Sequence, residues 1–318
     1  MHLGMGLICG GKIRDMLDAK FNFIIFLADW HSWINNKMGG DMGKIKTAGE
    51  YFKHCFTALG IDPVKVTYLW ASDLVKNRSY WEKVVRIAKG ITLQRTWRAL
   101  PIMGREMTQK DLETAWVFYP CMQSADIFQM DLDVACAGID QRKAHMLARD
   151  VAEKFGWTKP VSIHTHLLMG LSGLGKKMET TFDEDKAVDL EISAKMSKSV
   201  PSSAIFIHDS PEEIRTKLQG AFCPPKKVEG NPVLEIAKYI VFSWSKSLKI
   251  SRPPKYGGPI EFTSYAKLEA AYKKSGIHPL DLKNGIAESL IEILKPVREY
   301  FDKHPEPLKT MRRIEVTR

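Results

Sequence analysis

The stretch Ala194-Lys195-Met196-Ser197-Lys198-Ser199-Val200 decides how the rest of this chain is interpreted. Its two lysines stand three residues apart with a methionine and a serine between them, which makes a compact cationic loop. Such a loop can close over a polyphosphate and neutralise the charge that develops as a phosphoanhydride bond breaks. The alternative for a Lys-Ser cluster is a solvated surface turn, so the interpretation depends on what stands elsewhere in the chain.

The totals are those of a globular protein with room for two domains. The chain has 318 residues, of which 44% are hydrophobic and 26% charged. A net charge of +10 suits a polyanionic partner such as a nucleic acid. No apolar run reaches the roughly 18 residues of a membrane span and no signal peptide is recognisable, so we expect a cytoplasmic protein with no membrane partner.

Apolar runs of strand length alternate with helical patterns in the first part of the chain, which predicts an α/β fold with a parallel sheet. The predicted strands are Asn22–Leu27, Val64–Trp70, Asp133–Ala137 and Val161–His166. The predicted helices are Cys9–Ala19, Gly39–Leu59, Tyr80–Leu100, Gln109–Met130 and a helix that ends at Phe155. A polar, weakly structured run from Gly173 to Ile192 leads into the lysine loop.

The alternation stops after Ile207, and an all-helical second domain is expected. Ser210-Pro211-Glu212-Glu213 predicts a helix start with a capping box. Helices are expected at 211–222, 231–243, 263–274 and 280–301, linked by the Pro- and Gly-rich stretch 251–258. The division is therefore 1–207 and 208–318, and the basic end from His304 is expected to be a frayed tail.

Tyr119, Gln123 and Asp126 stand at i, i+4 and i+7, so they share one face of the predicted helix. A phenol, an amide and a carboxylate on one face indicate a binding surface. A solvent-facing polar stripe is the alternative, and Pro120 could kink the helix or start a new turn.

Polar residues also follow two of the predicted strands. Asp29 and His31 come after the first strand, and Asp140 and Gln141 come after the third. Open α/β sheets bind ligands at the carboxyl ends of their strands. The histidines and the five cysteines show no convincing spacing for metal ligands, so we expect no structural metal.

At this point the chain resembles the tyrosyl-tRNA synthetases of the archaeal and eukaryotic type, which are class I aminoacyl-tRNA synthetases. The blocks that carry the resemblance stand in the family's order: His2-Leu3-Gly4, Leu27-Ala28-Asp29-Trp30-His31, Tyr119 to Asp126, Gly138-Ile139-Asp140-Gln141-Arg142-Lys143, Lys195 to Ser199, Asp209 to Glu213, and His278-Pro279-Leu280-Asp281. The resemblance implies a Rossmann-type catalytic domain and a helical anticodon-binding domain, usually as a homodimer. It also implies that ATP with Mg²⁺ and tyrosine form tyrosyl-AMP, which tRNA(Tyr) then accepts.

The resemblance assigns the nucleotide end of the site. His2 matches the first histidine of the family's first signature and would stabilise the transition state at the α-phosphate. Gly4 would let the adenine approach the backbone, and Asp140 would contact the ribose. Lys195 and Lys198 would hold the leaving pyrophosphate.

The resemblance likewise assigns the amino-acid end. Tyr119, Gln123 and Gln141 would hold the ammonium and carboxylate side of tyrosine. Asp126 would accept a hydrogen bond from the substrate phenol, and phenylalanine would leave this buried carboxylate without that partner.

Four further residues match contacts to tRNA(Tyr). Arg98 and Lys143 match residues that read the first base pair of the acceptor stem. Tyr256 and Asp281 match anticodon readers, with a ring to stack and a carboxylate to accept from guanine. Arg98 could instead only balance phosphate charge, and Tyr256 could be loop packing.

The sequence departs from the family at its start. The strand that precedes the first signature in the family, with the tyrosine that shares the substrate phenol, is not in this sequence. A sheet without that central strand would leave its neighbours exposed. Met5 stands where the signature usually has a second histidine, and the insertion from Lys176 to Ile192 has no readable role. The alternatives are a tryptophan–tRNA ligase and a catalytically impaired, N-truncated paralogue that binds tRNA.

Overall fold

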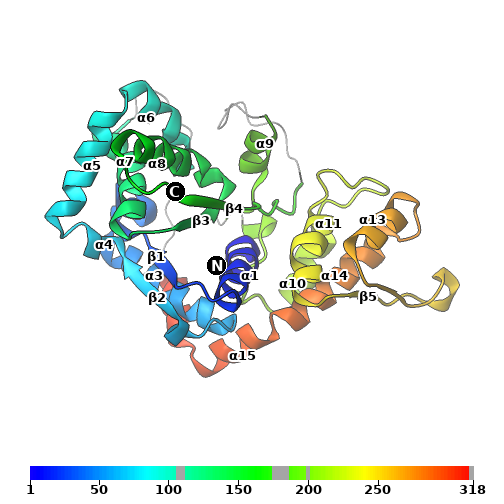
Figure 1. Cartoon of the computed structure of the whole chain (residues 1–318). Helices are drawn as coiled ribbons and strands as arrows, with labels where there is room; N and C mark the ends of the chain where they lie inside the picture. Colours follow the sequence, from blue (N-terminus) through cyan, green and yellow to red (C-terminus); the bar gives the residue numbers. More distant parts are fainter. Residues whose placement is uncertain (105–111, 174–185, 198–200, 315–318) are drawn as a thin grey trace.

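The computed structural model describes residues 1–104, 112–173, 186–197 and 201–314. An α/β part built from the N-terminal segments carries a smaller, mostly helical C-terminal part on one side (Figure 1). Lys198 and Ser199 of the lysine loop lie outside the described residues, as do residues 174–185 of the polar run before it.

Four parallel strands form the centre of the α/β part. They are β1 (Phe23–Leu27), β2 (Val66–Trp70), β3 (Val134–Gly138) and β4 (Val161–Thr165). β1 pairs with β2, and β3 pairs with β4, in both cases in parallel. The four strand predictions are confirmed, with ends that differ by one or two residues.

The expected single sheet is present as two separate two-stranded pieces. Among the described residues, no strand joins β1 to β3, so each of these strands has one edge without a strand partner. Both strands instead line a cavity of ≈ 800 Å³, which includes Phe23 and Ile24 of β1 and Val134 and Ala135 of β3. Unpaired strand edges inside a protein leave backbone N–H and C=O groups unsatisfied, which is costly.

Helices and short helical turns surround the strands. They are η1 (Gly4–Cys9), α1 (Gly10–Asp18), α2 (Asp29–Ile34), η2 (Lys37–Gly40), α3 (Met42–Ala58), η3 (Pro63–Lys65), α4 (Ala71–Leu74), α5 (Arg78–Gly90), α6 (Leu93–Ala99), η4 (Leu100–Met103), α7 (Thr114–Gln129), η6 (Ile139–Gln141), α8 (Arg142–Phe155), α9 (Lys186–Ala194) and η7 (Pro201–Ser203). Several of them, such as α2 and α4, were not predicted. α7 continues through Pro120.

The single helix predicted over Tyr80–Leu100 is wrong, because α5 ends at Gly90 and α6 begins at Leu93. Thr92 lies between them with an extended backbone, and its hydroxyl oxygen accepts a hydrogen bond from the backbone N–H of Arg95 at 3.1 Å. A threonine in this position starts a new helix, which the amphipathic pattern alone did not reveal.

The prediction of a weakly structured run up to Ile192 is also wrong in its last part. Residues 186–194 form the helix α9, which leads directly into Lys195. Helical structure here fixes the direction from which the chain enters the lysine loop.

The C-terminal part is mostly helical. Its elements are α10 (Pro211–Gly220), α11 (Pro232–Ile236), η8 (Ala237–Val241), α12 (Phe242–Trp244), β5 (Leu248–Ile250), η9 (Pro254–Tyr256), β6 (Ile260–Phe262), α13 (Tyr265–Lys273), α14 (Pro279–Ile293), α15 (Lys295–Lys303) and α16 (Glu306–Arg313). The predicted capping box at the start of α10 is confirmed: Glu213 N–H donates to Ser210 Oγ at 3.2 Å, and Ser210 N–H donates to Glu213 Oε2 at 2.7 Å.

The prediction of an all-helical second domain is wrong in one respect, because β5 and β6 form an antiparallel hairpin. The Pro- and Gly-rich stretch that looked like a linker is its loop. Arg252 holds the loop in shape, since its side chain donates to the carbonyl of Gly258 at 2.9 Å and to that of Gly276 at 3.1 Å. Three-residue strands are too short to show a clear alternation in the sequence.

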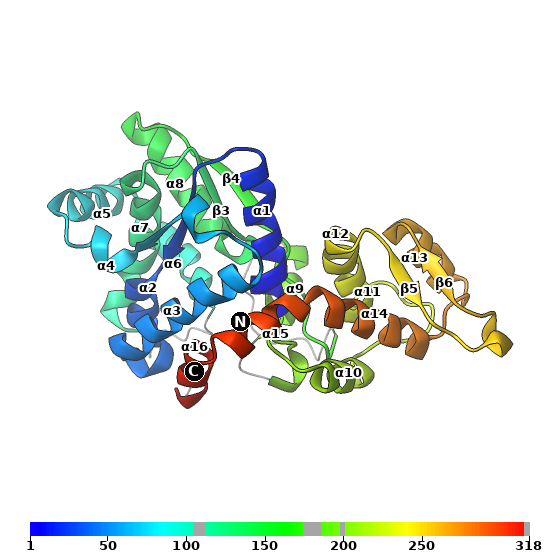
Figure 2. The same cartoon turned by 90° about the horizontal axis from the view of Figure 1, so that it is seen from below.

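The frayed tail predicted from His304 is wrong for residues 306–313, which form α16. Figure 2 shows α15 and α16 beside α3, so the chain returns to the α/β part after crossing the C-terminal part. Phe301 of α15 stacks on Tyr51 of α3 with ring centroids 6.1 Å apart. Leu308 and Met311 of α16 also pack against the hydrophobic core, and these apolar contacts explain why the polar, basic segment forms a helix here.

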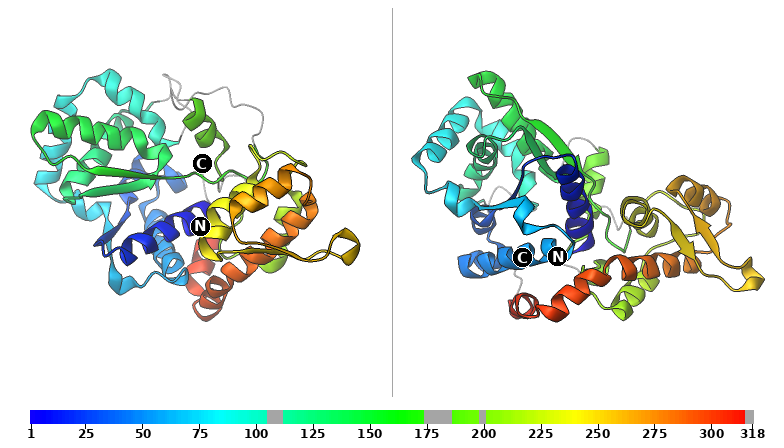
Figure 3. Two further views of the ribbon diagram at one scale, coloured as in Figure 1. Left: turned by 45° about the vertical axis from the view of Figure 1, so that its right-hand side comes forward. Right: turned by 60° about the horizontal axis from the view of Figure 1, so that its bottom comes forward.

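The start of the chain is held against the segment that precedes α10. Leu3 N–H donates to Ile205 O at 3.0 Å and Ile207 N–H donates to Met1 O at 3.1 Å, so residues 1–3 and 205–207 run antiparallel. One apolar cluster extends from Leu3 and Leu7 through these residues into the C-terminal helices, which lie to one side of the strands in both views of Figure 3. The domain division at residue 208 stays a prediction.

Candidate active site

Four residues predicted to hold tyrosine line one cavity. Tyr119, Gln123 and Asp126 project from α7, and Gln141 stands at the end of η6, just past β3. This cavity is the one that separates β1 from β3. The helical spacing that grouped the three α7 residues in the sequence therefore places them on a cavity wall and not on an exposed stripe.

A chain of amide hydrogen bonds fixes the two glutamines. Gln123 Nε2 donates to Gln141 Oε1 at 3.0 Å, and Gln141 Nε2 donates to the carbonyl of Ile102 at 3.1 Å. These two hydrogen bonds fix the orientation of both side-chain amides. Oriented amides can present a defined set of donors and acceptors to the polar groups of a ligand.

Asp126 is buried, with 3% of its surface exposed, and two side chains from other elements face its carboxylate. The hydroxyl of Tyr80 on α5 donates to Asp126 Oδ1 at 3.0 Å. His31 Nε2 on α2 lies 3.1 Å from Asp126 Oδ2. The hydrogen bond from Tyr80 therefore orients the carboxylate at Oδ1, while Oδ2 faces the His31 ring without a hydrogen bond to it.

Tyr80 is the residue of this candidate site that sequence reasoning missed. It is fully buried, and burial followed by the neighbouring Asp126 raises the pKa of its phenol, which keeps the proton that it donates. In the sequence it appeared only as an aromatic residue near a helix start, and no local signal links it to Asp126. His31 was named only as a residue beyond a strand end, and the structure places it in direct contact with the carboxylate.

Tyr119 closes the same wall from the other side of His31. The two rings meet edge to face with centroids 5.0 Å apart. Burial, then the charges of Asp126 and Asp140, raise the pKa of the Tyr119 phenol, so the hydroxyl remains a donor at any physiological pH. A neutral phenol can donate to a ligand oxygen in the cavity.

The residues that are predicted to bind ATP begin next to this wall, because Asp140 is bonded directly to Gln141 in the chain. Asp140 precedes Gln141 in η6, and its Oδ2 accepts from Lys195 Nζ at 2.7 Å. Lys195 reaches it from the end of α9, and its side chain remains 31% exposed. Gly104, at φ +65°, lies against the same ammonium group: a Cβ there would be 3.8 Å from Lys195 Nζ.

His2 and Gly4 lie together near the turn that follows β4. A Cβ on Gly4 would stand 3.2 Å from His2 Cε1 and 3.4 Å from the Cβ of Leu168. The space beside Gly4 is thus occupied by the His2 ring in this structure. His2 itself is positioned by the backbone pairing of residues 1–3 with 205–207.

The four predicted tRNA contacts fall into two groups. Arg98 is exposed on α6 and Lys143 is half-buried on α8, two helices that contact each other. Tyr256 is 59% exposed in the loop of the β5–β6 hairpin, and Asp281 stands in the first turn of α14. Arg98 and Lys143 belong to the α/β part, and Tyr256 and Asp281 belong to the C-terminal part. A nucleic acid that contacts all four residues has to span both parts.

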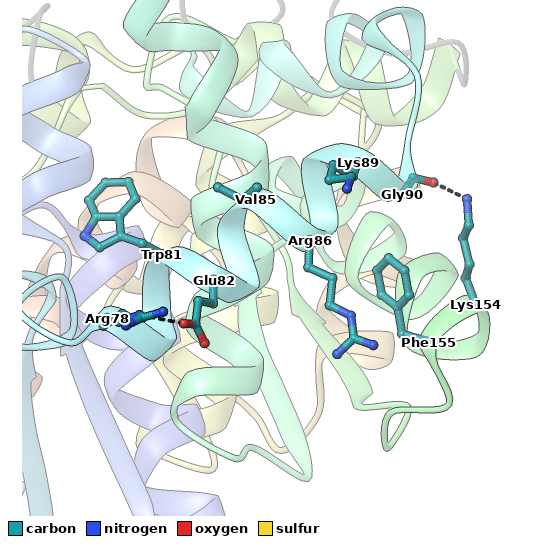
Figure 4. Close-up of a pocket in the computed structure, with 9 residues that line it drawn as sticks. All are labelled: Arg78, Trp81, Glu82, Val85, Arg86, Lys89, Gly90, Lys154 and Phe155. Carbon is teal, nitrogen blue, oxygen red and sulfur yellow. Dashed lines mark hydrogen bonds and ion pairs between the residues drawn. The ribbon is translucent and has the colours of Figure 1, made fainter.

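A second cavity, of ≈ 590 Å³, lies on α5 and the end of α8 (Figure 4). Arg86 stands over the ring of Phe155 at 5.2 Å, and Lys154 Nζ donates to Gly90 O at 2.7 Å across its edge. None of the predicted site residues lines it. It is therefore not the candidate active site.

His145 and His164 pack together with ring centroids 5.0 Å apart. Burial, then the neighbouring His164, lowers the pKa of His145 to about 4, so both rings are neutral at pH 7. In the described ranges no group of three His, Cys, Asp or Glu side chains could hold a metal ion. Within those ranges, too, every helix is too short or too polar to cross a bilayer.

Comparisons with known proteins agree with this arrangement. The family model described as "tRNA synthetases class I (W and Y)" matches residues 1–295. The tyrosine–tRNA ligase of Thermococcus gammatolerans is 47% identical over 100% of this chain and 88% of its own length. That of Sulfurisphaera tokodaii is 48% identical over 96% of this chain and 82% of its own length.

Solved structures give the same result. Tyrosyl-tRNA synthetase from Pyrococcus horikoshii, complexed with L-tyrosine, superposes with a TM-score of 0.89 at 44% identity, over 98% of this chain and 87% of that one. A tryptophanyl-tRNA synthetase from Campylobacter jejuni shares only the fold, with a TM-score of 0.62 at 21% identity, over 99% of this chain and 88% of that one. Relatives at 45–48% identity over nearly the whole chain are tyrosine–tRNA ligases, which decides against the tryptophan alternative. The chain therefore belongs to the archaeal-type tyrosyl-tRNA synthetases of class I.

Proposed function

We propose that this chain activates tyrosine with ATP to form tyrosyl-AMP and transfers the tyrosyl group to tRNA(Tyr). One observation carries the proposal beyond family membership. The four side chains that the resemblance assigns to tyrosine line one cavity, and Gln141 of that set is the direct neighbour of Asp140, which holds Lys195.

In the first step an oxygen of the tyrosine carboxylate forms a bond to the α-phosphorus, and the bond from that phosphorus to the bridging oxygen of pyrophosphate breaks. Lys195 would leave Asp140 for the pyrophosphate, and Lys198 would join it, so that negative charge is neutralised where it develops. His2 would stabilise the α-phosphate oxygens, and Asp140 would turn to the ribose. Mg²⁺ would arrive with ATP and be held mainly by its phosphates.

Asp126 would select tyrosine by accepting a hydrogen bond from its phenol. Tyr80 already orients the carboxylate through Oδ1, so the substrate would meet an acceptor that needs little reorganisation. Phenylalanine offers no donor and would lose a factor of about 10⁴ or more, as in sites that are built to bond a substrate hydroxyl. Tyr119, Gln123 and Gln141 would bind the ammonium and carboxylate groups.

The tRNA contacts would extend over both parts of the molecule. Arg98 and Lys143 would bind the acceptor end near the site, while Tyr256 would stack on an anticodon base and Asp281 would accept from a guanine edge. The net charge of +10 supports binding of a polyanion. The division at residue 208 would then separate catalysis from anticodon binding.

We also propose that the cavity between β1 and β3 receives a further parallel strand. Both bordering edges lack a strand partner among the described residues, and the lining of β1 is apolar, as a central strand of a parallel sheet requires. Such a strand would pass beside Asp126. It could supply a second group for the substrate phenol.

A homodimer is the expected assembly. Leu93 and Trp97 on α6 and Phe118 on α7 are 66%, 38% and 48% exposed, and these two helices lie side by side. Exposed large apolar side chains on two helices in contact support an interface there. If α6 and α7 form the dimer interface, Trp97→Glu should disrupt it by adding a negative charge. The sedimentation coefficient should then fall to that of a monomer.

The test of function is tyrosine-dependent exchange of pyrophosphate into ATP, run beside tryptophan. The chain is compared with a version that is extended upstream through its native reading frame. Activity with tyrosine alone supports the proposal, and a preference for tryptophan contradicts it. Activity only in the extended version would assign the strand a catalytic role.

A second candidate is a tRNA-binding protein without catalysis, which the open cavity beside Asp126 favours. It predicts binding of tRNA that weakens with salt and no adenylate. Detection of tyrosyl-AMP after a single turnover excludes it.

A further inference from the structure

His166, the residue that follows β4, lies between two carboxylates from elements on either side of it. Its Nδ1 is paired with Glu191 Oε1 on α9. Its Nε2 lies 3.4 Å from Glu235 Oε2 on α11. The imidazole therefore connects α9 of the α/β part with α11 of the C-terminal part.

The same two carboxylates also hold the backbone of the turn after His166. Glu191 Oε1 accepts from the N–H of Leu167 at 3.4 Å, and Glu235 Oε2 accepts from the N–H of Met169 at 2.9 Å. Without the imidazole, the two carboxylates would face each other across this turn and repel. The charged ring between them allows both to approach the turn.

The turn in question is paired directly with the lysine signature. Met196 N–H donates to Leu168 O at 2.6 Å, and Gly170 N–H donates to Ala194 O at 2.9 Å. Met169 and Lys195 form an antiparallel bridge. The position of Lys195 thus depends on where residues 167–170 lie.

We propose that His166 is a positioning residue that clamps α9 and the signature segment 194–197 to α11, through its paired contacts with Glu191 and Glu235. The mechanism above uses none of these three residues. The effect on catalysis rests on the proposed function, because it acts through Lys195, but the clamp itself is a statement about structure.

The surroundings of the ring support its charged form. Tyr239 of η8 stacks on it with centroids 4.0 Å apart and an interplanar angle of 22°. Burial lowers the pKa of His166, but the bonds and charges of Glu191 and Glu235 outweigh burial and raise it to about 9. The imidazole is therefore charged at pH 7, and the positive clamp between two negative groups is intact there.

The test compares His166→Gln with His54→Gln. Glutamine keeps a hydrogen-bond donor but loses the charge. His54 is a matched control, because it also joins two distant elements through one contact, to the hydroxyl of Tyr300 at 2.7 Å, and lies on α3 away from the signature. Hydrogen–deuterium exchange of peptides over 186–197 is the first measurement, and the KM values for ATP and tyrosine in pyrophosphate exchange are the second.

We expect the rate of deuterium exchange over 186–197 to rise about tenfold in His166→Gln, because losing an interaction equivalent to one pKa unit changes the opening equilibrium tenfold. The exchange rate of α7 in this variant, and that of 186–197 in the control variant, should not change. The KM for ATP should rise by a similar factor, and the KM for tyrosine should not change. If His166 only stabilised the fold away from the signature segment, His166→Gln would change the KM values for both ATP and tyrosine, or neither.

Unchanged exchange over 186–197 in His166→Gln overturns the clamp whatever the activity. If His166→Gln does not fold, Glu191→Gln replaces it: Glu191 is 27% exposed and sits on α9 itself, and the same local rise is expected. If the unaltered chain shows no tyrosine-dependent exchange of pyrophosphate, the proposed function fails, and the deuterium measurement still decides the clamp.

Discussion

Tyr119, Gln123 and Asp126, which are predicted to hold tyrosine, stand on one continuous helix, whereas His2 and Lys195, which are predicted to bind ATP, come from opposite ends of the sequence of the α/β part. Asp126 is buried and accepts a hydrogen bond from Tyr80, while Lys195 is partly exposed and forms an ion pair with Asp140. We call the first group the rigid end and the second the adaptable end. In the proposed reaction the Lys195 ammonium group would leave Asp140 for pyrophosphate, whereas Asp126 would keep its place.

The largest effect should come from the rigid end. Asp126→Asn exchanges an acceptor for a group that also donates, and we expect kcat/KM for tyrosine to fall by roughly 10³-fold or more. The measurement is pyrophosphate exchange at varied tyrosine concentration. Tyr80→Phe is the comparison: it keeps the carboxylate but removes one bond to it, so the loss of kcat/KM should be smaller, with a stability cost of about 1–3 kcal/mol in urea unfolding. Equal losses of kcat/KM in both variants would contradict the role of Asp126 as the acceptor of the substrate phenol.

At the adaptable end, Lys195→Ala should lower the rate of adenylate formation about 10²- to 10³-fold with little change in the KM for tyrosine. The reason is that a charge developing on pyrophosphate loses one of its cations. Lys53→Ala provides the comparison, because Lys53 also pairs with a carboxylate, that of Glu50 at 2.8 Å, and lies outside the site. A large rise in the KM for tyrosine would erase the distinction between the two ends.

Asp281→Ala tests whether the C-terminal part acts independently of both ends. We expect charging of tRNA to weaken about 10- to 100-fold, which corresponds to about 1–3 kcal/mol for one lost base contact, while pyrophosphate exchange is unchanged. Glu288→Ala on the same helix is matched in charge and pairs with Arg215 instead. Loss of both steps in Asp281→Ala would rule out an anticodon role.

The smallest effect should be a pH dependence confined to the adaptable end. The folded pKa of His166, about 9, lies above its ordinary value of 6.5, so its contribution is complete below 6.5 and is lost as the pH rises through 9. The groups that face it are Glu191, Glu235 and Tyr239, with Lys238 over the tyrosine ring at 4.9 Å. Proteolysis near α9 should rise several-fold between pH 7 and 9.5, relative to α7. An equal rise in proteolysis near α9 and near α7 would contradict this pH dependence.

The rest of the site could not be predicted because its contacts join distant segments. Spacing along one helix placed Tyr119, Gln123 and Asp126 together, since that arrangement is local. The bond from Tyr80 to Asp126 spans 46 residues and depends on how α5 packs on α7. In the same way, the hairpin β5–β6 and the helix α16 depend on partners that a local pattern does not contain.

The sequence by itself determined the family, the four parallel strands, the capping box at Ser210 and the residues that carry the proposed chemistry. These are local patterns, in which each residue's neighbours along the chain are sufficient. Only the tertiary structure decided that the strands form two pieces around a cavity, that Tyr80 and His31 lie against the carboxylate of Asp126, and that His166 lies between α9 and α11. These features arise from pairings between segments far apart in the chain, which depend on packing.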